Sequence, residues 1–211
     1  MNDTIKKLDD LFKSGDIKKE TLEMSLVNCH AEGLFSLVLN GEPGTLTRVF
    51  IATESIRMGD VALHSHKYML TITPLTVGLT HHKVVPGYDL KAPMYLYDSD
   101  KKELTFKHMK AYSLKSYALP LGSSATFDAE QIHTISCAKN TMWVVEEKKF
   151  HPLSKITKVL GMPFDVPDTF YNRPTESEIT HFYNVVKYQV MALMAKFSRV
   201  NKNRTTSSIA S

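Results

Sequence analysis

The chain has 211 residues, of which 43% are hydrophobic and 23% charged, and its formal net charge is +4. This length and balance are typical of one globular domain with appendages, and no run of about 18 apolar residues is present to span a membrane. The polar N-terminus, MNDTIKKLDD, lacks the apolar core of a signal peptide, and two cysteines far apart in sequence do not make a disulfide framework. We therefore expect a cytoplasmic protein in a reducing environment.

Residues 1–33 have the pattern of two helices. In the first, apolar residues recur at steps of three and four after a capping Asn-Asp pair at positions 2 and 3, and Gly15 ends the helix. Asp16 is placed to cap a second helix, which is predicted to run to the end of this segment. We interpret the segment as a helical layer packed on a sheet, with no chemical role for His30.

Strands are predicted from residue 34 onward. The turn Gly41-Glu42-Pro43-Gly44 joins residues 34–40 and 46–53 as a hairpin, and PGYDLKAP at residues 86–93 is predicted to be a loop. Further strands are expected over residues 61–78, 79–85, 94–98, 104–109, 111–119 and 142–146. Roughly eight to ten short strands suffice to close a small barrel or double-sheet jelly roll around one ligand cavity. We therefore predict a mainly β fold, with a barrel over residues 34–150.

Two histidines stand two residues apart in the stretch that we expect to line this cavity. Side chains two apart in a strand face the same way, so His64 and His66 can act as a clamp. Each neutral imidazole offers a metal ion one nitrogen lone pair. Two ligands are too few for a tight site, and His133 can supply a third from a neighbouring strand. The sequence therefore predicts a three-histidine metal site.

The stretch around this pair resembles the first motif of the cupin superfamily, G-(x)5-H-x-H-(x)3,4-E-(x)6-G. His64, His66 and Gly78 occupy motif positions, and Gly59 lies one residue closer to the first histidine than the motif asks. The Glu position falls on Thr71, so the family's carboxylate ligand is missing. The resemblance implies that Thr71 faces the metal and binds it weakly or not at all.

A second stretch, residues 122–137, resembles the second cupin motif, G-(x)5-P-x-G-(x)2-H-(x)3-N. Gly122 and His133 match at the right spacing. The motif's Pro, Gly and Asn are replaced by Asp128, Glu130 and Cys137. The resemblance covers residues 34–150 and implies a divergent cupin-like barrel, or jelly roll, that holds the three histidines.

Without the glutamate, the site resembles the three-histidine iron sites of thiol dioxygenases. Three neutral ligands leave the full +2 charge on the metal and leave coordination positions open, which favours a substrate anion and dioxygen side by side. The resemblance implies one Fe(II), with Zn, Ni or Mn as other candidates, and a small-molecule substrate such as a thiol. Two alternatives stay open: a non-catalytic cupin that binds a ligand or serves as an interaction module, and a metal-free sugar isomerase or epimerase cupin that uses His and Tyr as acid and base.

Several other residues are candidates for the pocket wall. Tyr95 and Tyr97 share one face of their strand, and Trp143 is the only tryptophan of the chain. Cys137, four residues after His133, shares its face, and we interpret it as a small buried hydrophobe.

Three further positions carry open alternatives. Arg48 is a candidate counter-ion for an anionic substrate, although we favour a surface position for both Arg48 and Arg57. One ring of the pair His81-His82 could point inward as a fourth ligand or as a donor that orients a ligand. For this pair we favour an exposed position.

The last part of the chain, residues 151–200, is predicted to be a proline-rich strap followed by a helix. The strap has at most a short helix around Ser154–Leu160, and a capping box at Thr175–Glu178 begins the long helix. Its single apolar stripe must be buried on the barrel or against a second copy, so a homodimer through residues 176–200 is an open prediction.

Residues 201–211 are predicted to be a disordered basic tail. Residues 179–211 carry five positive charges and no negative charge, so this region could contact nucleic acid. We favour a solvated tail over a nucleic-acid partner.

Overall fold

The computed structural model describes residues 2–98, 100–149, 156–161 and 169–207. Its strands are β1 (Leu34–Asn40), β2 (Thr47–Ala52), β3 (Leu63–His64), β4 (Met69–Pro74), β5 (Leu79–Asp98), β6 (Glu103–Ala118), β7 (Ala125–Phe127), β8 (His133–Cys137), β9 (Met142–Lys148) and β10 (Ile156–Leu160). They form two antiparallel sheets with the strand orders β1-β2-β9-β4-β7 and β10-β3-β8-β5-β6. The predicted mainly β, double-sheet architecture is confirmed.

The hydrophobic core between the two sheets surrounds the site. It combines side chains of the first sheet, such as Phe50, Ile72 and Trp143, with side chains of the second, such as Leu79 and Ile135. All five side chains are less than 9% exposed. Because each strand alternates inward and outward side chains, residues from both sheets meet in one layer.

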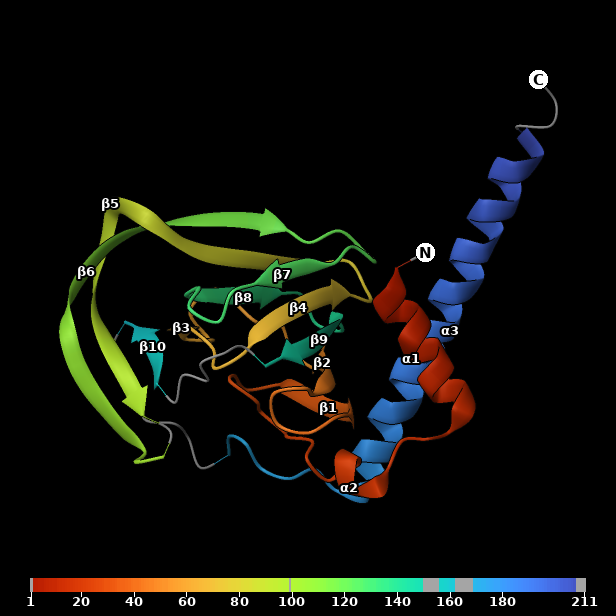
Figure 1. Ribbon diagram of the computed structural model, residues 1–211, viewed down its shortest axis with the longest axis horizontal. Coiled ribbons are helices and arrows are strands. Elements are labelled where there is room, and N and C mark those ends of the chain that lie inside the picture. The colour runs from red at the N-terminus through yellow and green to blue at the C-terminus, as the bar shows by residue number, and fades with distance from the viewer. Residues whose placement is uncertain (1, 99, 150–155, 162–168, 208–211) are drawn as a thin grey trace.

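The helices cover the outer face of the first sheet. Helix α1 (Asp3–Ser14) is capped by the Asn2 side chain, which accepts from two backbone amides, and Gly15 ends it in a left-handed conformation. Figure 1 shows α1 and α3 (Glu176–Ser207) side by side, on the flank opposite the long curved pair of β5 and β6. The N-terminal and C-terminal helices therefore form one layer.

The long helix α3 begins at the predicted capping box. The Glu178 amide donates to Thr175 Oγ1 over 3.2 Å, and the Thr175 amide donates to the Glu178 carboxylate over 2.8 Å. The buried face of the helix, which includes Val186, Val190 and Leu193, packs with β1, β2 and α1. The apolar stripe is thus covered within the chain. In the described part of the chain, no helix is long and apolar enough to cross a membrane.

The prediction of a second helix up to residue 33 is wrong, because only a single helical turn forms. Helix α2 covers only Lys19–Leu22, and an isolated β-bridge then joins Leu26 to Ser36. Asn28 and His30 adopt left-handed backbone conformations, with φ of 51° and 73°, which an α-helix does not contain. The apolar spacing in this segment reflects burial in a turn-rich loop.

The predicted loop over residues 86–93 is also wrong, because it lies inside β5. In the pairing of β5 with β6, Val85 lies opposite Ser113 and Leu90 lies opposite Tyr112. Residues 86–89 therefore form a bulge, and this Pro-Gly segment interrupts the pairing without ending the strand.

At the C-terminal side, two further predictions are corrected. The short helix expected at Ser154–Leu160 is strand β10 over its described residues, and it pairs with both β3 and β5. Ile, Thr and Val in this strand favour a pleated, half-buried surface. Helix α3 runs to Ser207, so the predicted disorder from residue 201 is wrong up to that point. Residues 151–155, 162–168 and 208–211 lie outside the described part of the chain.

The packing of α3 can be tested by truncating one buried side chain. Leu193→Ala is expected to lower the free energy of unfolding by about 2–5 kcal/mol, because it leaves a cavity in the interface with α1 and the sheet. Met191 is 49% exposed, and Met191→Ala is expected to change that energy by less than about 0.5 kcal/mol. Urea denaturation measures both, and equal effects would contradict this orientation of the helix.

Candidate metal site

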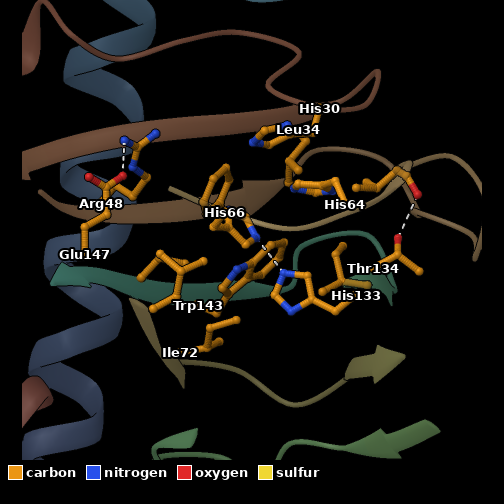
Figure 2. Close-up of a pocket in the computed structure, with 15 residues that line it drawn as sticks. His30, Leu34, Arg48, His64, His66, Ile72, His133, Thr134, Trp143 and Glu147 are labelled. Carbon is orange, nitrogen blue, oxygen red and sulfur yellow. Dashed lines mark hydrogen bonds and ion pairs between the residues drawn. The ribbon is translucent and has the colours of Figure 1, made fainter. Parts of the chain in front are cut away.

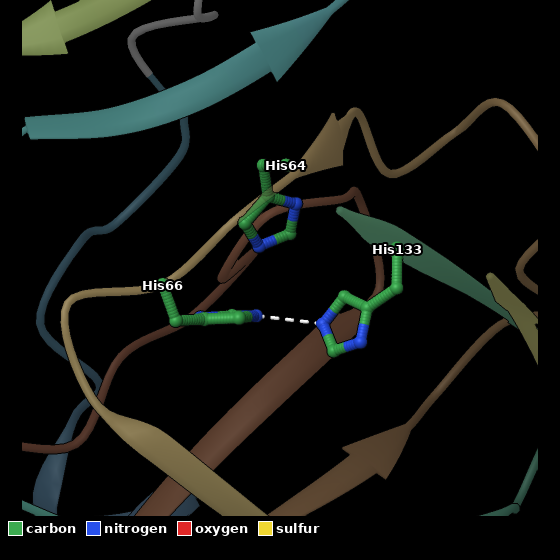
Figure 3. Close-up of side chains that lie close together, drawn as sticks. All are labelled: His64, His66 and His133. Carbon is green, nitrogen blue, oxygen red and sulfur yellow. Dashed lines mark hydrogen bonds between the residues drawn. The ribbon is translucent and has the colours of Figure 1, made fainter. Parts of the chain in front are cut away.

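The structure brings His64, His66 and His133 together inside the fold. His64 on β3 and His133 on β8 are directly opposite in register, and His66 follows in the loop after β3. One ligand atom from each ring lies within 4.8 Å of the others. Figure 3 shows the three rings with one nitrogen of each turned toward the other two. The geometry fits a three-nitrogen metal site.

His64 is held in the tautomer that a metal ligand requires. Its Nδ1 lies 2.7 Å from the Ala62 carbonyl oxygen, which can only accept, so Nδ1 donates its hydrogen there. The lone pair is then on Nε2, which is buried and has no hydrogen-bond partner. A buried acceptor without a partner costs about 1–3 kcal/mol, and a metal ion at the centre of the cluster would satisfy it.

His133 is positioned by a fourth histidine. Its Nε2 lies 2.6 Å from Nε2 of His66, and its Nδ1 lies 2.6 Å from Nε2 of His81 on β5. Metal-binding histidines usually donate their second ring hydrogen to a neighbouring acceptor, and His81 Nε2 is placed to be that acceptor. Sequence reasoning favoured an exposed His81-His82 pair, which is wrong: His81 is 0% and His82 7% exposed.

The two histidines of that pair face opposite sides of β5, as strand alternation requires. His81 stacks on Phe127 in the interior, with ring centroids 4.1 Å apart. His82 is bonded to the hydroxyl groups of Ser116 and Ser136, at 2.7 and 2.8 Å. Only His81 therefore belongs to the site.

The histidines of the cluster are neutral at pH 7. Burial lowers the pKa of His64, and it holds the pKa of His66 and His133 well below the ordinary 6.5, with a further contribution from the neighbouring histidines. Burial likewise lowers the pKa of His30 to about 3 and that of His81 to about 4. A metal ion would therefore bind without net loss of protons from the rings, although the hydrogen between Nε2 of His66 and Nε2 of His133 would have to move to the other nitrogen of its ring.

Two connected cavities adjoin the cluster. The inner chamber has a volume of about 90 Å³, room for a metal ion and a few small ligands, since one water occupies about 30 Å³. The second cavity, which we name the vestibule, has a volume of about 610 Å³ and shares His64 and His66 with the chamber. Figure 2 shows the chamber with His133, Trp143 and Ile72 around it. Trp143 thus lies where the sequence suggested.

Arg48 is not the surface residue that sequence reasoning favoured. It lines both cavities, and its Nη2 lies 2.6 Å from the Glu147 carboxylate, with side-chain exposures of 16% and 9% (Figure 2). The Gly44 amide donates to the same carboxylate over 3.0 Å. The pair places a positive group beside the histidines, but most of its charge is neutralised by the glutamate. Arg57 is exposed, as expected.

Thr71 does not face the cluster, which corrects the expectation drawn from the cupin motif. Its neighbours Leu70 and Ile72 line the chamber, so alternation turns Thr71 to the opposite face of β4. Its hydroxyl lies 3.2 Å from that of Thr126 on the neighbouring strand β7. Leu70 and Ile72 are an even number of residues after His66, so β4 keeps the alternation of the histidine pair, and the motif position alone suggested otherwise for Thr71.

The remaining candidates divide between the cavity wall and the core. Tyr97 lines the vestibule, whereas Tyr95 lines neither cavity and packs against Phe106, with ring centroids 5.8 Å apart. Cys137 is 7% exposed in the core between the sheets, and burial raises the pKa of its thiol to about 11. Cys137 is therefore in the buried, apolar environment that we predicted, away from the cavity wall.

Sequence reasoning missed His30 and its partner Tyr171. The His30 ring stacks on His64, with centroids 5.2 Å apart, and His30 Nδ1 lies 3.0 Å from the Tyr171 hydroxyl. Both residues have left-handed backbones, with φ of 73° and 57°. They lie in irregular segments without periodicity, so the sequence offers no signal that would have placed them here.

Comparisons with known proteins give only remote matches. No protein-family model and no curated protein matches the chain. It is similar to a cupin domain from Bordetella pertussis Tohama I, with 13% identity, TM-score 0.31, and coverage of 56% of this chain and 96% of that one. It is also similar to hydroxypropylphosphonic acid epoxidase from S. wedmorenis, with 14% identity, TM-score 0.35, and coverage of 62% and 61%.

A third match is Fe(II)-HppE with the alternative substrate (S)-1-HPP, with 16% identity, TM-score 0.33, and coverage of 55% of this chain and 50% of that one. The aligned part spans half of that chain. At this distance the matches carry no argument about chemistry, which must come from the residues. What the structure itself shows is a double-sheet fold that brings together three histidines able to hold a metal ion.

The neutral histidines make the stability of the metal-free protein depend on pH. An unfolded histidine takes a proton near pH 6.5, whereas folded His30 and His81 stay neutral down to about pH 3 and 4. Unfolding therefore binds protons, and the free energy of unfolding is expected to fall as pH drops below 6.5.

His81→Phe removes one such group while keeping an aromatic ring against Phe127. Between pH 6 and 5, the free energy of unfolding of this variant is expected to fall less steeply than that of the unchanged protein, by about 1 kcal/mol per pH unit. Urea titrations at both pH values measure the difference. The same slope in both proteins would mean that His81 is charged in the folded state.

Proposed function

We propose that His64, His66 and His133 bind one divalent metal ion, with Fe(II) as the first candidate, and that the protein is a non-haem iron dioxygenase acting on a small anionic substrate such as a thiol. The observation that carries this proposal is the buried Nε2 of His64, a lone pair within the cluster that has no partner. Burial without a metal would leave this polar atom unsatisfied.

The three-histidine donor set bears on which metal is bound. Imidazole nitrogens suit iron, zinc, copper and nickel, whereas manganese favours carboxylate and water oxygens. No Asp or Glu side chain joins the cluster among the described residues. We therefore keep Fe(II) first, with Zn and Ni next and Mn last.

The site's charge supports an anionic substrate. When bound, the metal supplies Lewis acidity and redox chemistry at coordination positions that the protein leaves open. The histidines add no negative charge to offset it. Apolar walls such as Phe50, Trp143 and Val145 lower the local dielectric constant of the chamber, which strengthens the attraction of an anion to the ion. Arg48, already paired with Glu147, contributes less.

A second candidate function is metal-free acid–base catalysis, as in an isomerase or epimerase cupin. The contact between His30 Nδ1 and the Tyr171 hydroxyl favours it, because a histidine and a tyrosine that both border the vestibule are the residue types that such acid–base chemistry uses. A non-catalytic binding module is the third candidate. Metal content and oxygen uptake separate these candidates from the dioxygenase.

A homodimer remains a proposal, and it needs a surface other than the buried stripe of α3. Tyr188 and Met191 on the same helix are 69% and 49% exposed and offer such a surface. Light scattering of the full chain tests the dimer, and a monomer at high concentration would count against it. A cytoplasmic location and a solvated basic tail are likewise proposals from composition.

Metal binding is tested by elemental analysis and calorimetry of the purified protein. One Fe(II) per chain is expected, and His64→Ala and His133→Ala are expected to lower metal affinity by more than about 100-fold, since each removes a ligand. His108→Ala is a matched control, because this histidine is exposed on β6. Affinity that is the same in all four proteins would reject the site.

Turnover is tested by oxygen uptake of iron-loaded protein with a panel of small thiols. We expect uptake in the unchanged protein and its loss in His66→Ala. Thr71→Val is expected to keep metal affinity and uptake within about twofold, because its hydroxyl faces Thr126 and not the cluster. Stoichiometric metal without uptake across thiol and diketone substrates would favour the binding module.

A further inference from the structure

The vestibule is far larger than a small thiol needs. Its volume is about 610 Å³ against about 90 Å³ for the chamber, and it reaches the histidines through His64 and His66. A substrate whose anionic group lies at the histidines would therefore extend its remaining part into the vestibule. The side chains there determine which kind of group fits.

Four aromatic rings gather around the vestibule, and they come from three separate parts of the chain. They are Tyr68, after the His64-His66 pair, Tyr97 on β5, and Phe170 and Tyr171 before α3. Phe170 and Tyr171 are neighbours with ring centroids 6.3 Å apart, and Tyr171 is 42% exposed. Aromatic side chains that stay partly exposed at one cavity are typical of a surface that binds another ring.

We propose that the vestibule is an aryl-binding subsite, which takes the aromatic part of a substrate whose anionic head lies at His64, His66 and His133. The assignment rests on the proposed function for the position of the head, and it names the substrate class as an aryl-substituted anion. The aromatic walls favour a planar group because offset and edge-on ring contacts add to the gain from burying apolar area.

The charges of the vestibule argue against the other ligand of aromatic cages, an alkylammonium cation. Among the described residues that line the vestibule, Glu147 is the one with a carboxylate. That carboxylate is bonded to Arg48. The carboxylate is thus not free to pair with a bound cation, which a metal ion at the histidines would also repel, whereas an aryl group needs no countercharge.

The wall that carries Tyr171 is held in place by contacts between distant parts of the chain. The Val27 amide donates to the Asn172 carbonyl over 2.8 Å, and the Asn28 side chain donates to the Thr169 carbonyl over 3.1 Å. Three left-handed residues, Asn28, His30 and Tyr171, occur in this wall. Strained backbone of this kind persists where the surroundings fix it, so the rings are pre-organised to receive a ligand.

The test compares probes that share a thiol and differ in one group: mercaptoacetate, mercapto(phenyl)acetate and thiocholine. Binding to Zn(II)-loaded protein is followed by the fluorescence of Trp143, the only tryptophan, which lines the chamber. Zinc is redox-inert, so the readout does not depend on turnover. We expect the phenyl compound to bind at least about tenfold tighter than mercaptoacetate, and thiocholine to bind more weakly than both.

Variants locate the effect. Tyr97→Ala and Phe170→Ala are each expected to weaken binding of the phenyl compound by roughly two- to tenfold and to leave mercaptoacetate unchanged. Tyr95→Ala is the matched control, since Tyr95 lies two residues away on β5 and lines neither cavity. Calorimetry repeats the titrations without the tryptophan signal.

The outcomes separate this inference from the proposed function. Equal affinity of the two acids in metal-loaded protein, tighter binding of thiocholine, or no binding of any probe would overturn the aryl subsite. Protein that takes up no metal but still prefers the phenyl compound, and loses that preference in Tyr97→Ala, would support the subsite while rejecting the dioxygenase.

Discussion

The structure depends on keeping a group of contacting histidine rings neutral inside an apolar double sheet. Each neutral ring has one donor and one acceptor, so the hydrogen bonds within the group must match. Ala62 takes the hydrogen of His64, His81 lies against His133, and His133 lies against His66. Two buried ring nitrogens in the described part of the chain are left without a partner, Nδ1 of His81 and Nε2 of His64, and of these the acceptor on His64 lies among the three converging nitrogens. Burial thus leaves an unpaired lone pair, which suits a metal cation because such an ion binds lone pairs and needs no hydrogen-bond acceptor of its own.

Much of the cluster could be predicted because it follows strand geometry. His64 and His133 were expected on neighbouring strands, and they are direct partners in register. The expectation for Thr71 failed because it was taken from a position in the cupin motif and not from strand geometry. Thr71 is five residues after His66, so strand alternation turns it to the opposite face, whereas Leu70 and Ile72 keep the phase of the histidine pair and line the chamber.

The parts that could not be predicted share a different cause. His30 and Tyr171 lie on segments without period, and their positions follow from contacts across some 140 residues of sequence. The ion pair of Arg48 depends on the register of β2 with β9, which no local pattern encodes. Cap and stop signals located α1 and the start of α3, because these act within one turn. Features set by neighbouring residues could therefore be predicted from the sequence, whereas contacts between distant elements could not.

The contacts between Val27 and Asn172 and between Asn28 and Thr169 have a consequence for the order of assembly. His64, His66 and His133 all precede residue 172 in the chain, so they leave the ribosome before the segment that completes the vestibule wall. The wall of the vestibule forms only after residue 172 is synthesised, because it joins residues 169–172 to residues 27 and 28 near the start of the chain. Loop closure over such a distance is slow compared with local folding. In a growing chain, the three histidines are thus accessible to ions before the wall around Tyr171 narrows the vestibule.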